Sequence, residues 1–171
     1  MTLGITRRTA LLGSAAAALG AVPQISGEAR KAEINLNGRT ISIDYTGVRT
    51  DGRTFGKTLA PFGKVWAFGS GAPPRITVNA YTLTELFELL PGAYSLYVIP
   101  RPDKWTLIPN TGKGAKGYDP SKDVGHLDLP VKPLRAPVQE LTFTLAREAS
   151  NVTRLSISFA SASVSTVLKV L

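Results

Sequence analysis

An Asn-Gly dipeptide between two runs of alternating apolar residues sets the strongest limit on how this chain can fold. The apolar residues alternate over residues 34–36 and again over residues 41–45, with Asn37-Gly38 between the two runs. Alternation with a period of two buries one face of a β-strand, and Asn-Gly is the dipeptide favoured in two-residue hairpin turns. The sequence therefore predicts a β-hairpin near the start of the folded part.

Short alternating runs continue along the chain. We expect strands within residues 76–80, 94–99, 127–131 and 141–145. In the stretch 155–170 the apolar residues move from odd to even positions, and a strand changes faces only through a turn or a bulge. We interpret this change as a turn near Ser161 to Ser163 that joins two strands.

One stretch, residues 82–90, has a helical pattern instead. Its apolar residues follow the spacing i, i+3, i+4, i+7, and Pro91-Gly92 ends the pattern within about two turns. With 171 residues the chain is long enough for one domain. The sequence thus predicts an all-β fold, an antiparallel β-sandwich of the jelly-roll-like or Ig-like kind, with one short helical turn.

The first thirty residues have the layout of an export signal. Arg7 and Arg8 precede an apolar run over residues 9–22, and paired arginines before a weakly hydrophobic segment are typical of the twin-arginine route; the general secretory route is the alternative. The run is about 14 residues, fewer than the ~18 to 20 that a spanning helix needs, so we expect no permanent membrane anchor. We predict a signal peptide over 1–29, export by the twin-arginine translocase, and a single domain over 30–171 in the periplasm or secreted from a bacterium.

The chain is basic, with 20 Lys and Arg against 12 Asp and Glu. In an exported protein this charge favours anionic cell-wall polymer, lipid headgroups or acidic polysaccharide as partners, and not nucleic acid. Beyond the signal no more than two basic residues are adjacent, at Arg30-Lys31, so the charge could also serve solubility alone.

In the segment from Arg49 to Lys64, basic residues are interleaved with Phe55 and Phe62. Such a surface can bind an anionic polymer, or a sugar stacked on an aromatic ring. The candidate ligand-binding residues are Arg53, Lys64 and Trp66, together with Tyr118. In the alternative interpretation the aromatic side chains belong to the core and the charges lie in water.

Catalytic candidates are few because the sequence has no cysteine and a single histidine, His126. A disulfide framework, a thiol nucleophile and a multi-histidine metal site are therefore excluded. A periplasmic hydrolase or carbohydrate-active enzyme would have to use His126 with Asp123 or Asp128. The spacing of the nearby acids is not that of an EF-hand, and we expect no metal.

The stretch GKGAKG, residues 112–117, spells a dinucleotide-binding motif. That motif acts at the start of a helix that follows a strand, and no helical pattern follows here. We interpret it as a mobile basic loop and expect no cofactor.

Five stretches carry a resemblance to a known family: GRTFG, LAPFGKVW, PGAYSLYVIP, DKWTLIPN and YDPSKDV. From about residue 41 to residue 170 the chain resembles the bacterial domain of unknown function 2911 (DUF2911), which implies an exported β-sandwich without an established activity. Members usually continue after Gly-Lys-Val-Trp with Arg-Thr-Gly-Ala-Asn-Glu, where this chain has Ala67 to Ala72. The resemblance implies that a site built from those polar groups is lost here and that the segment is a supporting turn.

These observations favour an exported, cofactor-free binding or structural module of the cell envelope. The periplasmic enzyme described above is the alternative.

Overall fold

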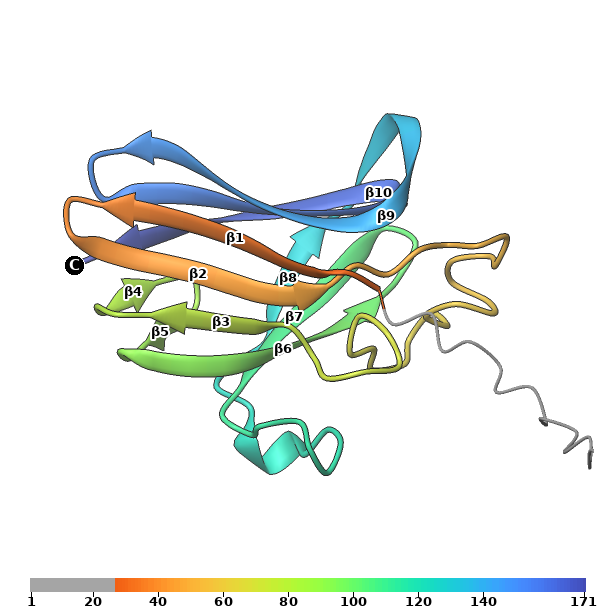
Figure 1. Cartoon of the computed structure of the whole chain (residues 1–171), viewed down its shortest axis with the longest axis horizontal. Coiled ribbons are helices and arrows are strands. Elements are labelled where there is room, and N and C mark those ends of the chain that lie inside the picture. Colours follow the sequence, from red (N-terminus) through yellow and green to blue (C-terminus); the bar gives the residue numbers. More distant parts are fainter. Residues whose placement is uncertain (1–26) are drawn as a thin grey trace, which may run out of the picture.

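The computed structural model describes residues 27–171 as two antiparallel β-sheets packed face to face (Figure 1). The predicted all-β sandwich is confirmed. Most of the predicted export signal, including Arg7 and Arg8, lies outside the described residues. The predicted boundary after Ala29 falls at the first residue of β1, where Ala29 pairs with Thr46.

The larger sheet has six strands in the order β1-β2-β3-β6-β7-β8. Their bounds are β1 Ala29–Leu36, β2 Arg39–Thr46, β3 Arg75–Val78, β6 Gly92–Pro100, β7 Lys104–Asn110 and β8 Leu127–Pro130. The smaller sheet has the order β5-β4-β10-β9. Its strands are β4 Thr82–Leu83, β5 Glu88–Leu89, β9 Lys132–Ala149 and β10 Val152–Val170.

The Asn-Gly hairpin forms as the sequence predicts. Asn37 and Gly38 have φ angles of 56° and 87°, the left-handed pair that a tight hairpin turn requires. Ile34 then pairs with Ile41 across β1 and β2. The four further strand predictions coincide with parts of β3, β6, β8 and β9. Strand β7 was not predicted, because its residues are buried on both faces and do not alternate.

The core lies between the two sheets and is rich in aromatic rings. Phe55, from the loop after β2, lies at the centre of this cluster, with its ring centroid 5.3 to 5.9 Å from those of Phe62, Trp66, Trp105 and Phe159. Trp105 and Phe159 are fully buried. Burial of side chains of this size contributes about 1.5–3 kcal/mol each. The loop is therefore anchored by its aromatic residues while its charged residues stay outside.

The predicted helix over residues 82–90 is wrong: the segment is the short hairpin of β4 and β5. Thr84 forms the turn, because its hydroxyl oxygen accepts from the backbone N–H groups of Leu86 (3.3 Å) and Phe87 (3.0 Å). A side chain that bonds its own backbone in this way competes with helix formation. The segment is also too short for a helix to be stable without a buried face, and Leu86 remains largely exposed. The short helical turn lies elsewhere, in the 3₁₀ helix Pro120–Lys122.

The predicted turn near residues 161–163 is also wrong, because β10 is one continuous strand. Its register against β9 shifts on both sides of Ala160, which has a φ of 52°. The extra residues of this β-bulge lie on β9, where three residues separate Thr142 from Val138 while one separates their partners Ser158 and Ala160 on β10. In β10 the buried positions change from odd to even across the left-handed Ala160. Phe159 before the bulge and Val164 after it both face the core.

Within residues 27–171, no helix has the length and apolar character needed to cross a membrane.

Candidate functional site

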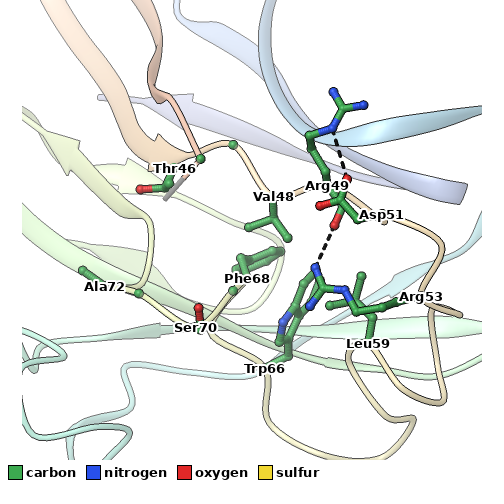
Figure 2. A pocket seen from close by; sticks show the side chains of 14 residues that line it. Thr46, Val48, Arg49, Asp51, Arg53, Leu59, Trp66, Phe68, Ser70 and Ala72 are labelled. Atoms are coloured by element: carbon green, nitrogen blue, oxygen red, sulfur yellow. Dashed lines mark hydrogen bonds and ion pairs between the residues drawn. The ribbon is translucent and has the colours of Figure 1, made fainter. Parts of the chain in front are cut away.

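A pocket of about 620 Å³ opens at the end of the sandwich where β2 ends and β3 begins (Figure 2). Two loop segments enclose it, one following β2 and the other leading into β3. The lining residues are Gly27, Thr46, Gly47, Val48, Arg49, Asp51, Arg53, Leu59, Trp66, Phe68, Gly69, Ser70, Gly71 and Ala72.

The floor of the pocket is apolar and rigidly held. Trp66 and Phe68 lie beside each other with ring centroids 5.1 Å apart, and Val48 and Leu59 complete the floor. Backbone hydrogen bonds of 2.7 and 3.0 Å between Trp66 and Val98 fix the tryptophan to β6. Both aromatic side chains are more than nine-tenths buried, so the pocket exposes only a small part of each ring.

Backbone strain is concentrated around this pocket. Asp51 and Phe68, which line it, and Ala60, next to Leu59, have φ angles between 45° and 57° without being glycine. For a bulky residue such as Phe68 this left-handed conformation is unusual. Strained residues cluster at functional sites, so the strain supports a role for this end of the sandwich beyond packing.

Charged side chains form one side of the pocket mouth (Figure 2). Arg49 donates to the Asp51 carboxylate at 3.3 Å, and this ion pair is largely exposed. Arg53 donates instead to two backbone carbonyls, those of Thr50 (3.3 Å) and Arg49 (3.0 Å). No carboxylate among the described residues lies within ion-pair distance of Arg53. The pocket thus presents a guanidinium that is held in place while its charge is uncompensated.

The segment from Phe68 to Ala72 forms the opposite wall. At Gly71 and Ala72, where the family resemblance leads one to expect Asn and Glu, the side chains are absent or small, and Ser70 is the one hydroxyl. Small residues leave this wall open and add no negative charge beside Arg53. The segment that was interpreted as a supporting turn is therefore part of the pocket.

The predicted ligand-binding residues do not all meet. Arg53 and Trp66 line the pocket, whereas Lys64 and Tyr118 do not. Lys64 is exposed in the turn closed by its backbone N–H and the carbonyl of Pro61. The interleaved charges in the sequence of the loop after β2 indicate a binding surface there, and Arg49 and Asp51 of this loop do line the pocket. Nothing in the sequence indicates that Phe68 and Ser70 lie beside that loop, because only the fold brings the second loop against the first.

Two of the three catalytic candidates do meet, outside the pocket. His126 Nε2 lies 2.9 Å from Asp123 Oδ2, and the Tyr118 hydroxyl donates to the same oxygen at 2.6 Å. The Asn110 amide donates to the other oxygen at 2.8 Å. Tyr118 also packs on Tyr97, with ring centroids 4.9 Å apart. This carboxylate ties the loop between β7 and β8 to the outer face of the larger sheet.

Burial, followed by the hydrogen bond to Asp123, raises the pKa of Tyr118 well above its ordinary value. Asp128, the third candidate, has different partners. It accepts from Lys104 at 2.5 Å and from the Thr106 hydroxyl at 2.6 Å, and these contacts lower its pKa. Within residues 27–171, no three His, Asp or Glu side chains are placed to hold a metal ion.

The fold and the pocket define a class: a β-sandwich with a ligand-sized pocket among the loops at one end. The chain belongs to the family described as protein of unknown function (DUF2911), whose model matches residues 27–168. The resemblance noted in the sequence is thereby confirmed. No curated protein and no solved structure matches the chain.

Proposed function

We propose that this protein is an exported binding module of the bacterial cell envelope, and that its pocket receives an acidic sugar of an anionic glycan or cell-wall polymer. The observation that carries the proposal is Arg53, a positioned guanidinium without a carboxylate partner at the mouth of an apolar pocket.

The charge of Arg53 favours an anionic group on the ligand. Its guanidinium is oriented by the carbonyls of Arg49 and Thr50, so little conformational entropy is lost when it binds a carboxylate. The net charge of the chain, +8, adds a long-range attraction for anions. Both terms weaken as salt concentration rises.

The floor favours a ligand with one apolar face. A sugar ring presents C–H groups on its faces and polar groups on its edge, which matches the apolar floor of Val48, Leu59, Trp66 and Phe68 and the polar rim. The volume of about 620 Å³ is within the usual range of small-ligand pockets. A fully charged small ion would leave this apolar floor unused.

The envelope location in the proposal rests on the N-terminal sequence. The pair Arg7 and Arg8 before a weakly apolar run supports export through the twin-arginine translocase. The ligands available to such a protein are surface polymers, many of which carry carboxylated sugars.

The test is an NMR titration of the full chain with glucuronate, and with neutral glucose as a comparison. We expect saturable shifts with glucuronate, and binding about tenfold weaker in Arg53→Gln because one charge-assisted contact is lost. Lys57→Gln removes an exposed charge from the same loop without touching the pocket, so it should bind like the unmodified protein. Absence of glucuronate binding, or equal loss in both variants, would contradict the proposal.

A further inference from the structure

A second hollow, of about 430 Å³, adjoins the pocket. It is lined by the start of β1, the end of β2 and the segment that leads into β3. Thr46 and Ala72 line both hollows. The two spaces are therefore neighbours along one surface, with an exposed and small Ala72 at their junction.

The second hollow carries a row of charges fixed by strand register. Lys31 on β1 pairs with Asp44 on β2, which pairs with Arg75 on β3. Lys31 is engaged by Glu33 at 2.6 Å. Arg75 has no carboxylate within ion-pair distance among the described residues, and its contacts with Ser95 Oγ (3.4 Å) and the Ala93 carbonyl (3.5 Å) are long. Arg75 thus resembles Arg53 in having no carboxylate partner, although its hydrogen bonds are longer.

Each of these two arginines shares its hollow with an aspartate to which it is not paired. Asp51 lines the pocket with Arg53, and Asp44 lines the second hollow with Arg75. Five basic residues and two aspartates line the two hollows together, so the lining is a row of positive charge interrupted by two carboxylates. It suits a chain whose negative charges are separated by neutral parts of each unit.

We propose that the two hollows form one binding groove for a linear acidic oligosaccharide of at least two sugars, with one carboxylate taken by Arg53 and another by Arg75. This inference rests on the proposed function, which it extends from a single sugar to a polymer. A monosaccharide has one carboxylate and satisfies only one of the two arginines. Binding of a second linked sugar is intramolecular and therefore costs less entropy.

The experiment compares glucuronate with uronic-acid oligomers of two to four sugars by calorimetric titration of the full chain at low salt. We expect the oligomers to bind at least about tenfold more tightly than the monomer. Arg75→Gln should remove this gain in affinity, while the monomer still binds at Arg53. Lys31→Gln removes the charge of an exposed residue in the same hollow. It should reduce the oligomers' gain in affinity only in part, because it weakens the local positive charge without removing Arg75. Arg135→Gln, an exposed arginine outside both hollows, should have no effect.

The outcomes separate the two proposals. If monomer and oligomers bind equally and Arg75→Gln changes nothing, the groove is wrong while the single-sugar pocket stands. If neither binds, the proposed function fails with it. If inorganic polyphosphate binds more tightly than the uronic-acid oligomers, the assignment to an acidic oligosaccharide is overturned.

Discussion

At the scale of single residues, the chain's one histidine and Asp123 belong to a hydrogen-bonded cluster that lies outside the pocket. Asp123 has a side chain that is 11% exposed and accepts from Asn110 and Tyr118, with His126 beside it. Its two oxygens are engaged by partners from β7, from the loop and from the residue before β8. The sequence shows that Tyr118, Asp123 and His126 are near one another along the chain. Only the folded structure shows which of them are hydrogen-bonded to one another.

The raised pKa of Tyr118 predicts a loss of stability in alkali. A group whose pKa is higher in the folded state contributes its full stabilisation below the unfolded pKa of about 10, and this is lost as the pH rises through the folded value. Stability in urea should therefore fall as the pH rises above about 10, and Tyr118→Phe should make this fall smaller. Tyr81→Phe, at a half-exposed tyrosine, is the control. An equally steep fall in Tyr118→Phe would show that Tyr118 does not govern the alkaline transition.

At the scale of secondary structure, elements specified by adjacent residues agree with the sequence-based prediction. Elements in which tertiary contacts override the local pattern do not. The Asn-Gly hairpin is specified by adjacent residues, so it could be predicted. The segment 82–90 has a helical pattern, but pairing of β4 with β10 and the turn at Thr84 override it. In β10 the apolar side chains change from one face of the strand to the other, which either a turn or a bulge can produce. Pairing with β9 continues on both sides of Ala160, so the pairing is bulged there and the strand does not turn.

The hairpin predicts a measurable cost for a side chain at Gly38. Its φ of +87° strains any other residue, although a Cβ there meets no atom within 4 Å. Gly38→Ala should lower the free energy of unfolding by about 1 kcal/mol, measured in urea. Gly71→Ala is the matched control, since that site is equally open and has no such φ. Equal stability of the two variants would mean that the turn relaxes without cost.

At the scale of the whole molecule, the β-sandwich and the family were predictable, whereas the pocket was only half predictable. The charged loop after β2 stood out in sequence and supplies Arg53. The wall from Phe68 to Ala72 is brought against that loop by the aromatic core, through contacts between segments that no local pattern reveals. The same holds for the row Lys31, Asp44 and Arg75, which depends on strand register.

The proposed export is also tested at the scale of the whole chain. Replacing Arg7 and Arg8 together by lysine should leave unprocessed protein in the cytoplasm, because lysine keeps the charge but not the arginine pair of the signal. Cell fractionation and the mass of the product provide the measurement. Normal processing of the double variant would exclude the twin-arginine route and favour general secretion.

The central claim is that the pocket binds an acidic sugar through uncompensated positive charge, and Ala72 offers its most direct test. Ala72 is exposed and borders both hollows, so a longer side chain fits there without disturbing the core. Titration of glucuronate at low salt should show binding at least about tenfold weaker in Ala72→Glu than in Ala72→Gln, since the two differ in charge and hardly in size. Equal affinity in the two variants would contradict the claim.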